Sequence, residues 1–466
     1  MLINPLSCTD SYKVSQWPQL PKGIRKASSY LESRGGYFPQ VGYMGGTYYN
    51  VNYFAKGFTL DNVKEFREDC YLHFRSDKIF NELGFMEMLK KYDGKWPMEI
   101  KAVPEGTTFD VSNILLDAEN TDPDFPWLVD YMETMLMLQW YPCTVFTLSR
   151  EIKKVIYQYL LETGTPELVH YKLHDFGFRG SSSIETAAIG GSAHLANFFG
   201  TDTMIALQLL KQFYGCRMGG FSIPASQHST ITSWGKEHEV DAMRNMLKKF
   251  WNEPFVACVC DSWDTENAAR RIWGEQLKGE ILEHKGTFVF RPDSGNAVEL
   301  TIKIMEILGE KFGFTINEKG YKVLDSHVRV IWGDGINYES IKAILENLKI
   351  YEWSADNIAF GMGGALLQKI DRDTQRFAFK CSYIEGIDDH GKSWSRDVFK
   401  DPITDPGKKS KSGRLKLIGV EGENGITYRT IRQEVTSEKN ILRPVFRNGE
   451  VLINETLEEI RKRAEQ

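Results

Sequence analysis

The sequence predicts an α/β protein organised around a (β/α) barrel, with a second domain built from both ends of the chain. From about residue 170 onward, strand-like runs that end in polar or glycine-rich loops alternate with amphipathic helical patterns. Several of these loops recur at intervals of roughly 30–40 residues, close to the length of one (β/α) barrel unit. We therefore expect residues 151–376 to form the barrel domain. Residues 1–150 and 377–466 are expected to form one discontinuous α/β domain, which is β-rich toward its C-terminal end.

Local patterns predict the individual elements of both parts. Apolar residues recur at helical spacing over residues 61–74, 79–92, 129–139, 149–162, 203–214, 239–250, 266–278 and 297–312. Residues 28–34, 97–106 and 377–384 have the composition of strands. Residues 38–53 are rich in Gly, Tyr and Phe and are expected to form a loop or an irregular hairpin. The pair Asn448-Gly449 predicts a hairpin, and a charged helix is expected from Glu455.

Composition and charge restrict the class of protein. The chain has 466 residues, of which 42% are hydrophobic and 26% are charged, as in an ordinary soluble protein. Its net charge of -6 argues against nucleic-acid binding as the main activity. The sequence shows neither a signal-peptide pattern nor an apolar run long enough to span a membrane. Its 7 scattered cysteines show no disulfide framework, so we expect a cytoplasmic enzyme with reduced thiols.

Three strand-like runs of the barrel region end in loops suited to phosphate or sugar. These loops carry Arg291 and Asp293, then Gly333 and Asp334, and finally Gly361, Gly363 and Gly364. Glycines before a helix let backbone N–H groups approach an anion, and an arginine offers a fork of donors to phosphate oxygens. Aspartates can hold ribose hydroxyls or Mg²⁺. The combination predicts a sugar-phosphate site at the carboxyl ends of parallel strands, although glycine clusters also occur in loops that bind nothing.

Other motifs leave two interpretations open. The stretch 174–180, HDFGFRG, could present Phe176 as a stacking surface beside an anion-binding Arg179. The simpler interpretation, which the residues alone slightly favour, buries the aromatic rings and gives the arginine an ordinary salt bridge. A lone loop histidine such as His228 is more often a hydrogen-bonding residue than a catalyst. Acids at a helix start, such as Asp261 and Asp264, are by default helix caps.

Two further patterns concern metals and polyphosphates. The histidine at 238 has no zinc-ligand spacing around it, so we expect no structural metal. The connection 400–416 is basic and contains Lys400 and Lys408. Such a stretch is usually solvated, but it could instead reach a polyphosphate.

Four motifs together resemble the nicotinamide phosphoribosyltransferase family, within the type II phosphoribosyltransferases. They are YKLHDFGFRG at 171–180, HSTITSWGK at 228–236, RPDSGN at 291–296 and FKDPITDPGK at 399–408. The resemblance extends over nearly the whole chain. It implies an incomplete α/β barrel with a second α/β domain, and a homodimer whose active sites lie at the subunit interface. The implied reaction joins nicotinamide to phosphoribosyl pyrophosphate in NAD salvage and gives nicotinamide mononucleotide and pyrophosphate. Mg²⁺ is the implied cofactor and ATP the implied co-substrate.

The resemblance also implies roles for individual residues. The pyridine ring would stack between Phe176 and Tyr12 of the partner subunit, and Asp202 would accept a hydrogen bond from the carboxamide. Phosphate and pyrophosphate would be held by Arg179, Arg291, and the partner's Arg372 and Lys380. Asp261 and Asp293 would bind magnesium, and Asp293 the ribose hydroxyls. Gly333, Asp334, Gly363 and Gly364 would hold the phosphoribosyl part of the product. His228 matches the histidine that the family phosphorylates with ATP.

Asp202 also predicts substrate preference, because a carboxylate attracts an amide N–H donor and repels the carboxylate of nicotinate. We therefore expect nicotinamide to be preferred. Ala257 and Ala378 depart from the family, whose better-known members have serines there, and the segment 35–53 is shorter. The alternatives are a nicotinate phosphoribosyltransferase and, less well supported, a lyase or isomerase barrel acting on a sugar phosphate. A non-catalytic secreted or signalling protein is a third class, which no sequence feature supports.

Overall fold

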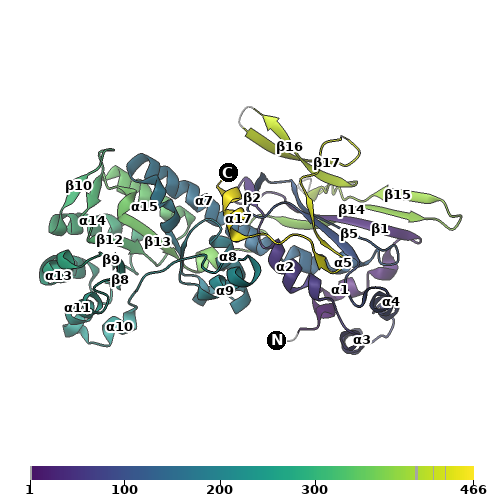
Figure 1. The fold of residues 1–466 in the computed structure, drawn as a ribbon, viewed down its shortest axis with the longest axis horizontal. Coiled ribbons are helices and arrows are strands. Elements are labelled where there is room, and N and C mark those ends of the chain that lie inside the picture. Colours follow the sequence, from purple (N-terminus) through teal and green to yellow (C-terminus); the bar gives the residue numbers. More distant parts are fainter. Residues whose placement is uncertain (1–2, 405–407, 423–424, 436, 466) are drawn as a thin grey trace. The chain divides into compact units, whose positions relative to one another are not determined.

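A computed structural model describes residues 3–404, 408–422, 425–435 and 437–465 of the chain (Figure 1). The chain divides into two compact units. Unit 1 comprises Met1–Thr147, Gln212–Gly215 and Asp371–Gln466, and unit 2 comprises Leu148–Lys211 and Cys216–Ile370. Helix α7 (Trp140–Thr163) begins in unit 1 and ends in unit 2. Among the described helices, none combines the length and the apolar character needed to cross a membrane.

Unit 2 is built on a six-stranded sheet in which every neighbouring pair of strands is parallel. Its order is β7-β6-β13-β12-β9-β8. In chain order the strands are β6 (Leu173–Asp175), β7 (Gly200–Thr201), β8 (Phe255–Val259), β9 (Thr287–Arg291), β12 (Val328–Trp332) and β13 (Ile358–Met362). Because the strands are parallel, their carboxyl ends all lie at the same end of the sheet.

An irregular segment, residues 221–226, joins the two edges of this sheet and closes it into a barrel. Phe221 forms a parallel bridge with Gly200 of β7, and Ala225 forms one with Ala257 of β8. Pro224 lies between these bridges and has no N–H to donate, so a regular strand cannot form there. The barrel therefore lacks one regular strand. The predicted fold class, an incomplete (β/α) barrel with a second discontinuous α/β domain, is confirmed.

Side chains alternate between the inside and the outside of the barrel, as strand geometry requires. Inside, Ala257, Val289 and Ile331 form a buried cluster, against which Phe176, Ile223 and Ala359 pack. Outside, the ring of Trp273 stacks on Phe288 at a centroid distance of 4.4 Å and meets Phe290 edge-on at 4.9 Å. The interior is thus packed, and a ligand has room only beyond the strand ends.

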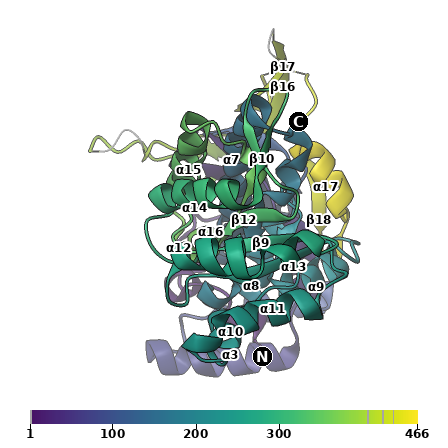
Figure 2. The same cartoon turned by 90° about the vertical axis from the view of Figure 1, so that its left-hand side faces the viewer.

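Helices follow the strands and lie around the outside of the barrel (Figures 1 and 2). They are α8 (Ile184–His194), α9 (Met204–Phe213), α10 (His228–Thr232), α11 (Glu239–Lys249), α13 (Lys278–Glu283), α14 (Ala297–Phe312) and α15 (Tyr338–Ile350). The predicted helices at 203–214, 239–250 and 297–312 are confirmed as α9, α11 and α14. The predicted helix at 266–278 is confirmed, although only its start, α12 (Thr265–Asn267), is α-helical and the rest is a π-helix, η7 (Ala268–Gln276).

Unit 1 contains a seven-stranded antiparallel sheet in the order β15-β14-β1-β5-β3-β18-β19. In chain order the strands are β1 (Ile24–Ser33), β3 (Met98–Ala102), β5 (Ile114–Asn120), β14 (Phe377–Ile387), β15 (Ser393–Asp397), β18 (Arg443–Arg447) and β19 (Glu450–Val451). The predicted hairpin is confirmed between β18 and β19, where Asn448 and Gly449 have φ values of 50° and 86°. Strands β16 (Leu415–Gly422) and β17 (Gly425–Arg432) form a separate hairpin.

The helices of unit 1 include α3 (Leu60–Phe74), α4 (Glu82–Tyr92) and α17 (Leu457–Ala464), which confirm three predicted helices. The predicted helix at 129–139 is instead two short ones, α5 (Leu128–Tyr131) and α6 (Glu133–Met137). Of the predicted basic connection 400–416, residues 405–407 lie outside the described part of the chain.

The prediction of a loop or hairpin at 38–53 is wrong, because this stretch contains the short strand β2 (Gln40–Gly42) and helix α2 (Gly46–Asn52). Helix α2 begins where the carboxylate of Glu105 accepts the N–H groups of Gly45 at 2.7 Å and Thr47 at 2.6 Å. A cap from a residue this distant in the sequence leaves no local pattern, which explains the error.

Candidate active site

The loops after four barrel strands meet around the ring of Phe176. A Cβ atom built on Gly361 would lie 1.9 Å from ring carbon Cε2 of Phe176. A Cβ on Gly333 would lie 3.7 Å from the same carbon and 2.6 Å from Oδ1 of Asp293. The Phe176 N–H donates to the carbonyl of Met362 at 3.0 Å, which fixes the start of the loop. The parallel sheet therefore brings Phe176 together with Asp293 and Gly333, which the sequence predicts at neighbouring strand ends.

Arg179 and the glycine loop at 363–364 border an open space. Arg179 lies in the turn η5 (Phe178–Gly180), and a Cβ on Gly180 would be 3.3 Å from Cα of Gly364. A Cβ on Gly364 itself would meet no atom within 4 Å. The Arg179 side chain is exposed and has no ion-pair partner among the described residues. The helix predicted after the glycines is only one turn, α16 (Gly364–Leu367). The exposed guanidinium of Arg179 and the open space at Gly364 thus leave room for an anion.

Arg291 has a buried donor that the protein does not use. Its Nη1 donates to the carbonyl of Ser226 at 3.2 Å, and its Nη2 lies 3.5 Å from Oδ2 of Asp293. The Nε atom is buried and has no hydrogen-bond partner within the described part of the chain. An unpaired buried N–H costs about 1–3 kcal/mol, so this donor is suited to a bound anion.

His228 and Asp261 form the second charged feature of this end of the barrel. His228 is the first residue of α10, and its Nε2 lies 2.9 Å from Oδ1 of Asp261. The Asp261 side chain is only 3% exposed, whereas that of His228 is 45% exposed. A carboxylate on Nε2 holds the proton there and leaves Nδ1 with its lone pair. Asp264, in contrast, is a helix cap as expected, because its Oδ1 accepts the Asn267 N–H at 2.9 Å.

Asp202 follows β7 directly and has an exposed side chain. The hydroxyl of Ser222 donates to its Oδ1 at 2.6 Å, and its N–H donates to the carbonyl of Asp175 at 2.9 Å. Sequence reasoning missed Ser222, because it belongs to the irregular segment that closes the barrel and follows no strand pattern. The hydroxyl thus occupies Oδ1 and leaves Oδ2 available for a ligand.

Asp334 lies in the Gly-Asp-Gly turn after β12. The indole N–H of Trp332 donates to its backbone carbonyl at 2.7 Å, and Gly335 continues the turn with a left-handed φ of 67°. The Asp334 carboxylate is exposed, beside the loop of Gly333. This position suits a ligand hydroxyl that arrives from solvent.

The side chains that the site offers to a metal ion bind through oxygen atoms. Within the described ranges, no group of three or more His, Cys, Asp and Glu side chains could hold a metal ion. Asp261 and Asp293 offer carboxylate oxygens at the ends of neighbouring strands β8 and β9. Mg²⁺ commonly takes one or two carboxylates, several waters and substrate phosphates, so this donor set fits Mg²⁺ better than a metal that requires an all-protein cage.

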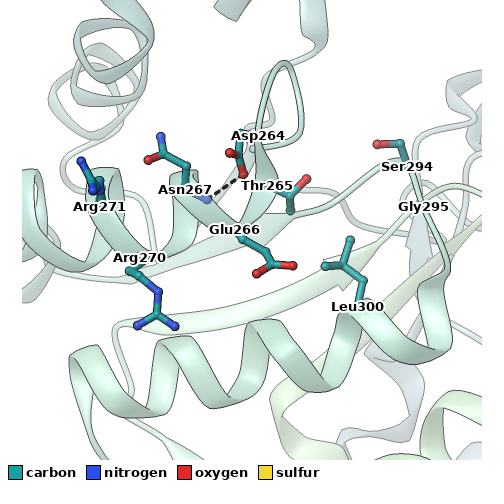
Figure 3. A pocket seen from close by; sticks show the side chains of 9 residues that line it. All are labelled: Asp264, Thr265, Glu266, Asn267, Arg270, Arg271, Ser294, Gly295 and Leu300. Atoms are coloured by element: carbon teal, nitrogen blue, oxygen red, sulfur yellow. Dashed lines mark hydrogen bonds between the residues drawn. The ribbon is translucent and has the colours of Figure 1, made fainter.

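A pocket of about 550 Å³ lies beside the loops that follow β8 and β9 (Figure 3). It is lined by Asp264, Thr265, Glu266, Asn267, Arg270, Arg271, Ser294, Gly295 and Leu300. Two of its charged groups already have partners, since Glu266 pairs with Lys303 and Arg270 with Glu310. None of the predicted ligand-binding residues lines this pocket.

Five predicted residues belong to unit 1. These are Tyr12, Arg372, Lys380, Lys400 and Lys408. The side chain of Tyr12 is 58% exposed, and those of Arg372, Lys400 and Lys408 are also exposed. Burial lowers the pKa of the Lys380 amino group, and the charges of Arg34 and Lys400 lower it further. Arg34 was not among the predicted residues, although it ends the strand-like run at 28–34, before two glycines. Unit 1 thus carries a cluster of cations.

Comparison with known proteins decides the family. Residues 171–450 match the model of the nicotinate phosphoribosyltransferase (NAPRTase) family. The chain belongs to this family. Residues 4–100 also match the N-terminal domain of nicotinamide phosphoribosyltransferase.

Two relatives resemble this member of the NAPRTase family over its full length. A nicotinamide phosphoribosyltransferase of Xanthomonas campestris is 44% identical over 471 residues, which covers 100% of this chain and 98% of the relative. A nicotinamide phosphoribosyltransferase of Acinetobacter baylyi is 30% identical over 503 residues, which covers 100% of this chain and 97% of the relative. The resemblance inferred from the four motifs is therefore confirmed.

Solved structures support the same fold. The nicotinate-nucleotide pyrophosphorylase of Pyrococcus furiosus has a TM-score of 0.59 and 17% identity, and the match covers 99% of this chain and 94% of that one. Human nicotinic acid phosphoribosyltransferase has a TM-score of 0.54 and 14% identity, with coverage of 98% and 93%. At these identities the similarity concerns the fold alone.

The contact between Gly361 and Phe176 yields a first testable prediction. In the variant Gly361→Ala the new Cβ would collide with the ring, so the ring must leave its position at the barrel mouth. If the ring of Phe176 stacks on a substrate, as expected from the sequence, the KM for that substrate should rise at least tenfold in steady-state kinetics. The control is Gly279→Ala on α13, where a Cβ meets no atom within 4 Å. An unchanged KM in Gly361→Ala would show that the ring position does not matter.

Proposed function

We propose that this protein is a nicotinamide phosphoribosyltransferase of NAD salvage. It transfers the phosphoribosyl group of phosphoribosyl pyrophosphate to nicotinamide and releases pyrophosphate. The single observation that carries the choice of nicotinamide is Asp202, an exposed carboxylate whose Oδ1 is held by Ser222. The full-length relatives that bear the name of this activity support the assignment. All seven cysteines are free thiols, in keeping with a cytoplasmic enzyme.

The substrate groups are assigned to the chain's own residues as follows. The pyridine ring stacks on Phe176, and the carboxamide N–H donates to Oδ2 of Asp202. Asp293 and Asp334 accept the ribose hydroxyls. Phosphate oxygens take the unused Nε donor of Arg291, the guanidinium of Arg179, and the N–H groups of the loop with Gly363 and Gly364. The Arg291 Nε donor has no partner in the described protein, and a Cβ on Gly364 would meet no atom within 4 Å, so both positions can receive a ligand.

The reaction is a displacement at the anomeric carbon of the sugar. The bond from this carbon to the pyrophosphate oxygen breaks, and its electron pair leaves with pyrophosphate. The lone pair of the ring nitrogen forms the new bond. Stacking on Phe176 holds the nitrogen in line with the carbon, which removes part of the entropic barrier. Arg179 and Arg291 stabilise the negative charge that grows on the leaving group. Mg²⁺ held by Asp261 and Asp293 would supply further stabilisation of this charge.

ATP is assigned to His228. Its Nε2 is held by Asp261, so Nδ1 is the nucleophile that takes the γ-phosphoryl group while ADP leaves. Hydrolysis of the resulting phosphohistidine returns the free imidazole and releases phosphate. This cycle would couple ATP hydrolysis to nucleotide synthesis.

The five predicted residues of unit 1 are assigned to the site of a partner subunit in a homodimer. Tyr12 would cover the second face of the pyridine ring. Arg372, Lys380, Lys400 and Lys408 would bind phosphate or pyrophosphate. The clustering of cations around Lys380, which lowers its pKa, supports a polyanion as its ligand.

Asp202→Asn tests the substrate assignment. The amide that replaces the carboxylate no longer repels nicotinate, and its N–H₂ group can donate to the nicotinate carboxylate. Two charges about 4 Å apart interact by about 4 kcal/mol at an effective dielectric of 20. We therefore expect the ratio of kcat/KM for nicotinamide to that for nicotinate to fall at least tenfold. Paired assays with both substrates measure it.

The control for this experiment is Asp241→Asn on the outer helix α11, where the carboxylate pairs with His238 and Arg244. It removes the same charge and should leave the ratio unchanged. A ratio in Asp202→Asn equal to that of the wild type would remove Asp202 from the pyridine site.

His228→Ala tests the role of ATP. The wild-type protein incubated with γ-labelled ATP should acquire acid-labile label, and the variant should acquire none. His238→Ala is a matched control, because His238 also pairs with an aspartate, Asp241 at 3.0 Å. We expect full labelling of this control. Label that persists in His228→Ala would place the phospho-acceptor elsewhere.

A further inference from the structure

Asp175 connects the two residues to which the pyridine substrate has been assigned. It is the last residue of β6 and is completely buried. Its Oδ1 accepts the N–H of Gly177 at 2.7 Å, directly after Phe176. Its backbone carbonyl accepts the N–H of Asp202 at 2.9 Å. One residue thus fixes the loop of the stacking ring and the start of the loop that carries the specificity carboxylate.

Among the described residues, the carboxylate of Asp175 has only neutral stabilising neighbours, the Gly177 N–H and the Thr203 hydroxyl, which lower its pKa. Oδ2 is buried and lacks a hydrogen bond within the described part of the chain, and a Cβ on Gly191 of α8 would lie 2.9 Å from it. No described cation forms an ion pair with this carboxylate, and burial together with the charge of Asp202 raises its pKa to about 6. Burying a carboxylate without a cation is unfavourable. A carboxylate kept there at this cost is a candidate for a functional role.

We propose that Asp175 is a positioning residue for nicotinamide: its side chain holds the Phe176 loop and its main chain holds Asp202, so that ring and carboxylate face one substrate. This inference rests on the proposed function, because it concerns the same pyridine site. Asp175 touches no substrate itself. Among the described residues, Asp175 makes no hydrogen bond with the groups assigned to phosphate, which are Arg179, Arg291 and the loop of Gly363 and Gly364. The effect of removing its side chain should therefore fall on one substrate.

The test compares Asp175→Ala with Asp175→Asn in steady-state assays of the full-length protein. In Asp175→Ala the Gly177 N–H loses its acceptor. We expect the KM for nicotinamide to rise at least tenfold, while the KM for phosphoribosyl pyrophosphate stays within about twofold. In Asp175→Asn the amide oxygen still accepts from Gly177, although a neutral acceptor binds more weakly than a charged one. We expect a twofold to fivefold rise in the KM for nicotinamide alone.

The matched control is Asp117→Ala in β5 of unit 1, another buried aspartate whose pKa burial raises to about 6. A merely structural role for Asp175 predicts that both proteins lose stability without a selective change in either KM. Equal rises in both KM values, or a fall in kcat alone, would overturn the proposal. If Asp175→Ala does not fold, Asp175→Asn decides, and an unchanged KM for nicotinamide contradicts the inference. A wild-type protein that does not use nicotinamide would instead overturn the proposed function.

Discussion

The candidate site depends on the parallel register of the barrel strands. Gly361 pairs with His174, Ile331 with Ala359, and Ala257 with Val289, so equivalent positions of neighbouring strands lie at one level. This register puts the loops after β6, β9, β12 and β13 around one opening. It also explains why glycine stands at position 361, since any side chain there would occupy the space of the Phe176 ring. A shift of one residue in any strand would turn its loop side chain from the opening to the outer helices.

The opening contains polar groups that the protein itself leaves unsatisfied. Arg291 keeps a buried Nε without a partner, Asp175 keeps a buried Oδ2 without one, and the gap before Gly364 is open. Elsewhere, the buried charges of Lys13 and Glu32 have ion-pair partners, Glu133 and Arg34, each at 2.7 Å. Other buried polar atoms, such as Nη2 of Arg34, also lack a hydrogen bond among the described residues. Each buried orphan costs about 1–3 kcal/mol in the free protein. A ligand that brings phosphates would satisfy the Arg291 donor and enter the gap, whereas Asp175 acts through the Phe176 loop. The convergence of these groups at the barrel mouth is the physical reason for locating the chemistry there.

Local sequence patterns were sufficient for most of the barrel, because strands, helices and their loops alternate with clear periods. They could not reveal features set by distant partners. The helix at 46–52 depends on the carboxylate of Glu105, and the closing segment with Ser222 depends on bridges to β7 and β8. The glycines were predicted to form a phosphate loop, yet Gly361 makes room for a ring, and of the three only Gly364 borders open space. Asp261 looked like a helix cap by its position, whereas its contact with His228 needed the fold to be seen.

The measurement that tests the account most directly is product formation by the purified protein from phosphoribosyl pyrophosphate and Mg²⁺, with nicotinamide and nicotinate supplied separately. The account requires nicotinamide mononucleotide as the main product, with kcat/KM for nicotinamide at least tenfold above that for nicotinate. This margin corresponds to about 1.4 kcal/mol of preferential binding by Asp202. A preference for nicotinate would contradict the role of Asp202, and the absence of product from both pyridines would contradict the assignment of the site.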